Sequence, residues 1–197
     1  MFLLYCKMIR IEARNHGFTL IELMVTIAIL AVVLALGLPN LREFLVRNQV
    51  GSITSEFSAD IARTRIEAIS RNGCVTMCAS STTNTSTPIC GAATGVNNWQ
   101  TGWVIFSNPT CDSTITTPTA ASPLISVRQS GSTSFELERE TGPTNRFMFD
   151  SRGLANGIQS KFVLRYVPES ISSPHYRTIC LSSTGRVTTK KYAESCP

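Results

Sequence analysis

The sequence FTLIELMVTIAILAVVLALGL, residues 18–38, decides how this chain is organised. It contains one charged residue, Glu22, and is otherwise almost entirely apolar. A helix of about 20 apolar residues, rising about 1.5 Å per residue, spans the hydrocarbon core of a bilayer. The stretch therefore predicts one membrane-spanning helix near the N-terminus.

The residues before this helix set its orientation. They carry three basic side chains against one acidic side chain: Lys7, Arg10 and Arg14 against Glu12. The positive-inside rule places this end in the cytoplasm, so the chain after Leu38 is expected outside the inner membrane, in the periplasm. A cleaved secretory signal is the alternative, but its apolar core of about 7–15 residues precedes a small-residue cleavage site. Here the small residue, Gly17, comes before the apolar run, which favours a retained helix.

The composition indicates one folded domain with an appendage. The chain has 197 residues, of which 43% are apolar and 16% are charged, and this charge fraction is too low for a disordered protein. Its two histidines are His16, which precedes the apolar helix, and His175. One histidine in the folded domain argues against a histidine-based metal site or catalytic relay. Short catalytic and nucleotide-binding motifs are missing from the sequence. We therefore expect no enzymatic activity, no cofactor and no metal.

Cysteine usage agrees with export. One cysteine, Cys6, precedes the apolar helix, and six follow it: Cys74, Cys78, Cys90, Cys111, Cys180 and Cys196. An even number in an exported domain indicates disulfides, although spacing alone leaves their connectivity open. We expect Cys180–Cys196, because these two bracket a short terminal segment, and we favour Cys78–Cys90 and Cys74–Cys111 for the rest. Zinc at Cys74 and Cys78 is the alternative, but no second close pair follows and the compartment favours oxidation.

The helical pattern continues beyond the apolar stretch. Gly37 and Pro39 interrupt it, which predicts a kink or local unwinding. Apolar residues then recur at helical spacing on one face, which we expect to be buried: Val46, Val50, Ile53, Phe57 and Ile61, continued by Ala62, Ile66 and Ile69. Asn72-Gly73 is a good helix end. The sequence thus predicts one helix from residue 18 to about residue 71, roughly 80 Å long, with an amphipathic second half.

After Gly73 the pattern changes to short strands. Alternating or apolar segments rich in β-branched and aromatic residues lie at 74–79, 102–107, 124–129, 133–139, 146–150, 161–167, 177–182 and 186–189. Two Ser/Thr-rich stretches, 79–88 and 112–123, are typical of exposed loops. The fold class is therefore α+β, with the long N-terminal helix packed on an antiparallel sheet or sandwich of about eight strands.

The segment GFTLIELMV, residues 17–25, resembles the processing motif of type IV pilins and type II secretion pseudopilins. A basic leader, Gly before Phe, Glu at the fifth position and an apolar helix make up that motif. The rest resembles the minor pilins of the GspH/FimT family in five segments: IARTRIEAISRN (61–72), VTMC (75–78), WQTGWVIF (99–106), FMFDSRGLA (147–155) and CLSSTGRV (180–187). Together with 17–25 they are spread over most of the chain after Gly17.

The resemblance implies a pilin fold and a defined life cycle. A prepilin peptidase would remove the leader, 1–17, by cutting between Gly17 and Phe18, and the new N-terminus would be methylated. The subunit would then leave the inner membrane and join other minor and major pilins in a pilus or pseudopilus, reaching the cell surface in a pilus. The remaining parts are the transmembrane and filament-core helix 18–39, the amphipathic helix 40–72 and the β-rich domain 73–197.

Glu22 is the expected assembly residue. A carboxylate within a lipid-facing helix is unfavourable by about 2.5–3.5 kcal/mol at the bilayer centre and by less near an edge. In a filament its natural partner is the positive α-amino group of Phe18 on a neighbouring subunit. The alternative is that Glu22 stays at the cytoplasmic interface with its carboxylate in water.

The excess positive charge lies in the last 21 residues. The expected mature chain has 15 Lys and Arg against 12 Asp and Glu, and the difference falls in the tail 177–197, which has Arg177, Arg186, Lys190 and Lys191 against Glu194. Here Gly185, Arg186 and Val187 match the Gly-Arg-x-Arg pattern of DNA-binding FimT-type proteins, and Thr188 replaces its second arginine. Arg186, Thr188 and Lys190 would share one face of a strand. We therefore predict non-specific binding of DNA phosphates by five tail residues, Arg177, Arg186, Thr188, Lys190 and Lys191; the alternative is a solvated strand end.

Two functions follow. The first is a type IV pilus minor pilin that primes or caps filament assembly and takes part in DNA uptake. The alternative is an H-type pseudopilin of a type II secretion system with a structural role at the tip. Trp99 and Trp103 are candidates for stacking on single-stranded bases, but Trp103 opens an apolar strand, so we expect it in the core.

Overall fold

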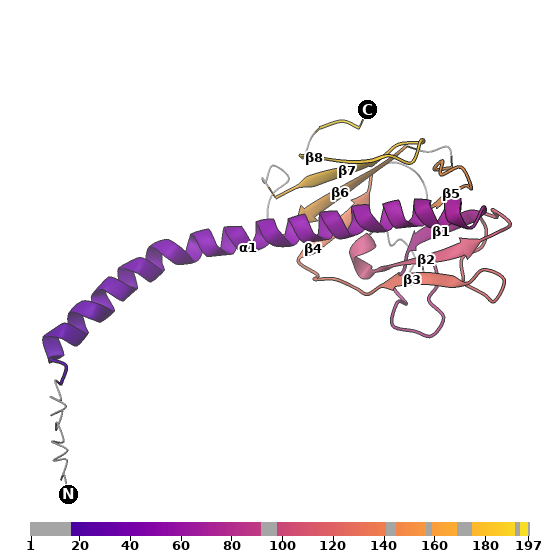
Figure 1. The fold of residues 1–197 in the computed structure, drawn as a ribbon. Coiled ribbons are helices and arrows are strands. Elements are labelled where there is room, and N and C mark those ends of the chain that lie inside the picture. The colour runs from indigo at the N-terminus through magenta and orange to yellow at the C-terminus, as the bar shows by residue number, and fades with distance from the viewer. Residues whose placement is uncertain are drawn as a thin grey trace, which may run out of the picture. The chain divides into compact units, whose positions relative to one another are not determined.

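The computed structural model describes residues 17–91, 98–140, 145–156, 159–168, 175–191 and 194–196, without the side chains of 38–40. The leader 1–17 expected from the sequence therefore lies outside the described residues, except for Gly17. The chain divides into two compact units, residues 1–43 and 44–197. Each unit is described by itself below, and the helix α1, Leu20–Ser70, belongs to both (Figure 1).

In the first unit α1 is an apolar helix whose side chains are exposed through residue 37. Its residues 20–37 are all exposed, and its mean hydropathy reaches 2.7, so it is long and apolar enough to cross a membrane. The helix continues without a break through Gly37 and Pro39, so local unwinding, one of the two expectations there, is wrong, and the other, a kink, stays a prediction. The reason is that proline removes one intrahelical donor while the turns on both sides keep theirs.

In the second unit α1 buries one stripe against the β-structure. The buried stripe contains the predicted Val46, Val50, Ile53, Phe57 and Ile61, and it continues with Thr64 and Ala68. The predicted continuation through Ala62, Ile66 and Ile69 is wrong, since all three are exposed. Steps of three and four residues from Ile61 lead to Thr64 and Ala68, whereas the other three lie about 100° further around the helix.

In the described residues, eight strands form two antiparallel four-stranded sheets (Figure 1). Sheet A has the order β3-β2-β1-β5, with β1 Cys74–Ala79, β2 Trp103–Asn108, β3 Leu124–Arg128 and β5 Arg146–Phe149. Sheet B has the order β4-β6-β7-β8, with β4 Phe135–Arg139, β6 Ser160–Tyr166, β7 Arg177–Leu181 and β8 Val187–Lys191. A short 3-10 helix, η1 Trp99–Thr101, precedes β2. The predicted α+β class and all eight strands are confirmed, with ends that differ by one or two residues.

Phe57 of α1 is the centre of the core. Its ring makes edge-to-face contacts with Trp99, Trp103 and Phe162, at centroid distances of 5.4, 5.2 and 4.9 Å. Both tryptophans are fully buried, and Trp103 Nε1 donates a 2.7 Å hydrogen bond to Asp60 of α1. The prediction that Trp103 is a core residue is confirmed. Neither indole ring is available for stacking on bases.

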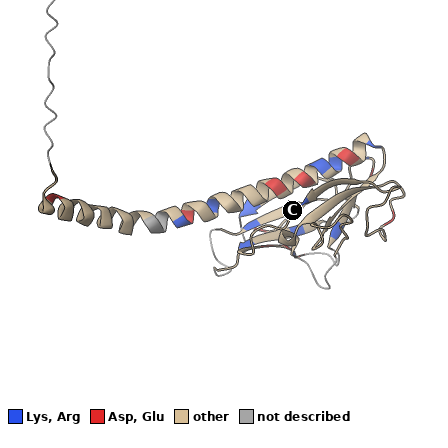
Figure 2. Cartoon of the chain, turned by 90° about the horizontal axis from the view of Figure 1, so that it is seen from below, with Lys and Arg blue, Asp and Glu red and all other residues tan. Residues whose placement is uncertain are grey.

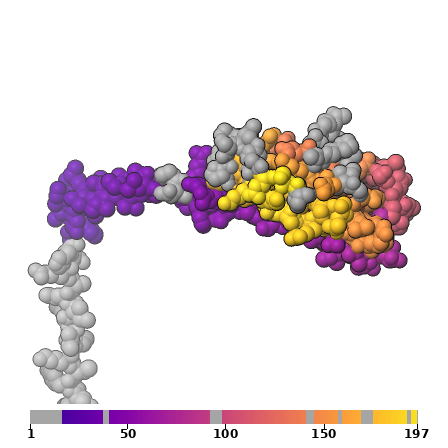
Figure 3. Space-filling view, turned by 90° about the horizontal axis from the view of Figure 1, so that it is seen from above, coloured from indigo at the N-terminus to yellow at the C-terminus, as the bar shows by residue number. Residues whose placement is uncertain are grey.

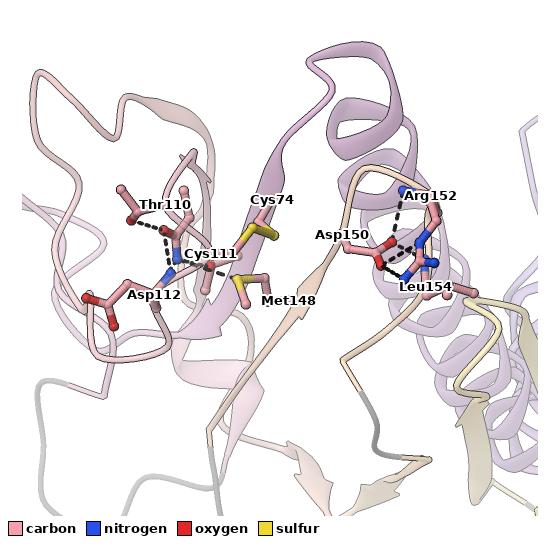
Figure 4. Close-up of a disulfide and its surroundings, with 10 residues drawn as sticks. Cys74, Thr110, Cys111, Asp112, Met148, Asp150, Arg152 and Leu154 are labelled. Atoms are coloured by element: carbon pink, nitrogen blue, oxygen red, sulfur yellow. Dashed lines mark hydrogen bonds and ion pairs between the residues drawn. A yellow bond between two sulfur atoms is a disulfide. The ribbon is translucent and has the colours of Figure 1, made fainter.

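A second small core covers the outer face of sheet A. It contains Cys78, Cys90, Val104 and Phe106. Two disulfides connect the Ser/Thr-rich loops to this sheet: Cys78–Cys90 and Cys74–Cys111, which Figure 4 shows. The loops also meet each other, because the N–H of Cys90 donates to the carbonyl of Thr116. They are therefore only partly exposed, in contrast to expectation.

Candidate functional site

The first candidate site is the start of the apolar helix. No described atom outside its immediate neighbours lies within 4 Å of a Cβ placed on Gly17, and Phe18 is 86% exposed. The backbone at Gly17 and Phe18 is therefore accessible, as far as the described residues show. Such openness is what a peptidase needs in order to bind this segment in an extended form.

Thr19 is the residue that starts α1. Its hydroxyl oxygen accepts a 3.2 Å hydrogen bond from the N–H of Glu22, and its carbonyl accepts from the N–H of Leu23. The order Thr-x-x-Glu at a helix start is the capping-box pattern. The carboxylate of Glu22 therefore lies in the first turn, where the helix dipole favours a negative charge by about 0.3–1 kcal/mol. This role of Thr19 was not predicted, although the Thr-x-x-Glu pattern is visible in the sequence.

The second candidate site is the basic tail, which forms a hairpin of β7 and β8. Cross-strand partners share a face, so Thr188 lies beside Cys180 and Lys190 beside Thr178 on one face, while Lys191 and Arg177 are paired on the other. The disulfide Cys180–Cys196 returns the end of the chain to the first of these faces.

The five candidate DNA-binding residues differ in exposure. Arg186 and Lys191 are exposed, whereas Arg177, Thr188 and Lys190 are half-buried. Lys190 Nζ donates a 2.9 Å hydrogen bond to the carbonyl of Ser195, and Thr188 lines a cavity of about 60 Å³ next to Cys180 and Cys196. The structure therefore divides the cations between two faces of the hairpin. Elsewhere acidic and basic residues are interleaved along the second half of α1 (Figure 2).

Three of the quoted sequence segments meet at Arg65, Gly153 and Gly185. Arg65 Nε of α1 donates a 2.9 Å hydrogen bond to the carbonyl of Gly153. Gly185 has a φ of +77°, and a Cβ placed on it would lie 2.4 Å from that same carbonyl oxygen. Only glycine fits there, because both the backbone conformation and the close approach exclude a side chain. These segments therefore have a structural role, because their contacts hold the turns at Gly153 and Gly185 against α1.

Asp150 shapes one of those two turns. Its carboxylate accepts 2.9 Å hydrogen bonds from the N–H groups of Leu154 and Arg152 (Figure 4). The hydrogen bond from Leu154, followed by the bonds from Arg152, holds the pKa of Asp150 below its ordinary value. The turn therefore carries a charged, fully bonded carboxylate at neutral pH.

These features define the class of type IV pilin-like subunits. They are an exposed apolar helix that continues into an α+β domain, a Gly–Phe junction before it and Glu in its first turn. The family model described as "Type II transport protein GspH" matches residues 54–185, and the prokaryotic N-terminal methylation motif matches residues 13–38. The chain belongs to the GspH family. Its members are structural subunits rather than enzymes.

Solved structures show the same fold. Two crystal forms of the type IV minor pilin FimU of Pseudomonas aeruginosa are similar to this chain at 15% and 14% sequence identity. The matches cover 75% and 71% of this chain and 92% and 91% of the FimU chains, with TM-scores of 0.54 and 0.51. No curated protein sequence matches this chain.

Proposed function

We propose that this chain is a minor pilin that primes or caps the assembly of a type IV pilus. The observation that carries the proposal is the apolar half of α1, because 0% of its most hydropathic stretch is buried within the chain. Such a surface needs lipid before assembly and other helices after it. The alternative is an H-type pseudopilin of a type II secretion system, which would use the same surface in a pseudopilus.

The proposed cycle starts at the inner membrane, with the N-terminus in the cytoplasm and the β-rich domain in the periplasm. Prepilin peptidase cuts between Gly17 and Phe18, and the new amine of Phe18 is methylated. The subunit then joins other minor and major pilins, and the α-amino group of Phe18 pairs with Glu22 of a neighbouring subunit. In a pilus the assembled subunit reaches the cell surface.

Cleavage with retention of the helix is the first test. We expect the protein in sheared filaments to begin at Phe18, with a methylated amine, as measured by mass spectrometry of its N-terminal peptide. Gly17→Ala should slow processing mildly, and Gly17→Leu should block it, because a bulky side chain closes the backbone that the peptidase binds. A mature N-terminus beyond Leu38 would mean a secretory signal and contradict the proposal. Finding the protein in a pseudopilus alone would favour the alternative.

DNA binding during uptake is a second candidate function, which we assign to the basic tail. The observation that favours it is the closed tail, in which Cys180–Cys196 holds Arg186 and Lys190 beside one face of β8. A disulfide loop of about 15 residues stabilises by about 3 kcal/mol in the chain-entropy model. The cations are therefore held in place before any phosphate arrives.

Salt dependence tests this candidate function. Contacts from Arg186 and Lys190, which share one face of the hairpin, predict a log–log salt slope of about −1.8 on duplex DNA, and Lys191, on the other face, does not add to it. Arg186→Ala should reduce the slope by about one, Thr188→Arg should strengthen binding, and Arg71→Ala, far along the sequence and already bridged to Glu67, should change neither. If the domain shows no salt-dependent binding at low ionic strength, the tail has a structural role only.

A further inference from the structure

An open groove lies between α1 and β8 in the second unit. It has a volume of about 510 Å³, and the residues that line it include Ala59, Ala62, Arg65 and Ile66 of α1 and Arg186 and Thr189 of the β8 side. Figure 3 shows the last strand, in yellow, beside the second half of the helix, in purple. The helix lines the groove with the small side chains of Ser58, Ala59 and Ala62, so the groove has room for side chains of another segment.

The helix face along this groove is apolar and uncovered. Ile66 is 65% exposed and Ile69 is 48% exposed, while Ala59 and Ala62 are also exposed. These four positions follow one another at helical spacing, beside the stripe that the two sheets bury. Sheet B thus ends at β8 without covering this face of α1, and one further strand, about 4.8 Å beyond β8, would lie over it.

The outer edge of β8 is able to accept such a strand. The N–H of Ser182 donates to the carbonyl of Arg186, so Ser182 and Arg186 are a hydrogen-bonded pair at the end of the β7–β8 ladder. The next pair, Leu181 and Val187, is therefore a non-hydrogen-bonded one. Because bonded and non-bonded pairs alternate, the N–H and C=O groups of Val187 and Thr189 point away from β7. No described residue pairs with these groups. An unpaired strand edge is a template for another strand.

The charges around the groove define the chemistry of its occupant. Arg65 and Arg186 both line it, and none of the described residues that line it is acidic. An incoming strand that carries a carboxylate near its end and an apolar residue over Ala62 would therefore complement both the charge and the apolar face.

A second copy of this chain does not supply that strand. Its acidic edge strand is β4, but Asn98 already forms a bridge to Glu138 there and accepts a 3.1 Å hydrogen bond from the N–H of Leu137. The edge strands β3 and β5 carry Arg128 and Arg146 and no acid. Because none of the described edge strands of a second copy is both acidic and unpaired, we assign the occupant to a different protein.

We infer that β8 and the α1–β8 groove bind an extended, acid-bearing strand of a different pilin subunit, which adds to sheet B as a fifth strand. This inference rests on the proposed filament role and names the surface through which the domain contacts its neighbour. The backbone groups of Val187 and Thr189 pair with the incoming strand, Ala59, Ala62 and Ile66 take its apolar side chains, and Arg65 and Arg186 bind its carboxylate.

The test uses the full chain in cells that assemble filaments. Benzoylphenylalanine at position 62 is expected to cross-link, on illumination, to one other pilin that mass spectrometry identifies. Thr189→Pro removes an outward N–H without removing a bond to β7, and it should lower this cross-link by about tenfold, equal to about 1.4 kcal/mol. The matched control Thr189→Ala keeps the backbone donor and should stay within about twofold of the original chain.

Two further variants keep the test decisive if proline disturbs the hairpin. Ala62→Leu fills the groove at an exposed helix position, and Arg186→Glu reverses its charge. With the probe moved to position 59, each should lower the cross-link by at least about tenfold.

Each alternative outcome overturns the inference. A cross-link to a second copy identifies the wrong occupant. Full cross-linking with Thr189→Pro excludes strand addition. A chain that enters sheared filaments but gives no cross-link from position 62 overturns the inference and leaves the proposed function intact, whereas a chain absent from filaments overturns both.

Discussion

The variant Glu22→Ala is expected to insert into the inner membrane normally and to be lost from sheared filaments. Insertion becomes easier, because the substitution removes the one charge of the apolar helix. Assembly fails because the α-amino group of Phe18 on the neighbouring subunit loses its partner in an apolar setting. Breaking a buried pair is unfavourable by about 3–5 kcal/mol, so incorporation measured by immunoblotting should fall more than about a hundredfold.

The helix cap provides the matched control for this variant. Thr19→Ala removes the hydroxyl that accepts the N–H of Glu22 but keeps the carboxylate. Loss of a cap is unfavourable by about 0.5–2 kcal/mol, so this variant should weaken incorporation only mildly. Equal loss for Thr19→Ala and Glu22→Ala would assign Glu22 to helix capping alone. Normal incorporation of Glu22→Ala would exclude any need for charge pairing.

Phe57→Ala is expected to give the largest loss of stability in the folded domain. The side chain is fully buried and contacts three aromatic rings from β-structure and η1. Its removal should lower the free energy of unfolding of residues 44–197 by about 3–5 kcal/mol, measured in urea with the disulfides intact. Ile66→Ala, on the exposed face of the same helix, should change it by less than about 0.5 kcal/mol. Similar values for the two variants would contradict the placement of Phe57 at the centre of the core.

The elements that sequence predicted well are those with a strong local signal. The apolar run 18–38 has one physical solution, a long helix, and the stripe from Val46 to Ile61 repeats at 3.6 residues. The strands are short, apolar or alternating, and separated by Ser, Thr, Gly and Pro, so each was found. The end of a strand depends on its neighbour in the sheet, which explains shifts of a residue or two at β2 and β8.

What sequence could not predict depends on contacts between distant residues. Ile66 and Ile69 read as core residues, but the sheets end before they reach them. The Ser/Thr-rich loops read as exposed, yet two disulfides draw them onto sheet A. Arg65, Gly153 and Gly185 lie in three separate segments, so their contact became visible only in three dimensions. The position of Lys190 likewise depends on Ser195, which the disulfide Cys180–Cys196 brings back.

The three disulfides each close within a short, continuous stretch of chain. Cys78–Cys90 lies inside the loop closed by Cys74–Cys111, and Cys180–Cys196 lies near the C-terminus. A polypeptide that crosses the membrane from its N-terminal side exposes the first four of these thiols before the last two. In the proposed orientation, translocation therefore keeps Cys180 and Cys196 from competing with the first four thiols, whereas pairing among those four depends on how they fold onto sheet A.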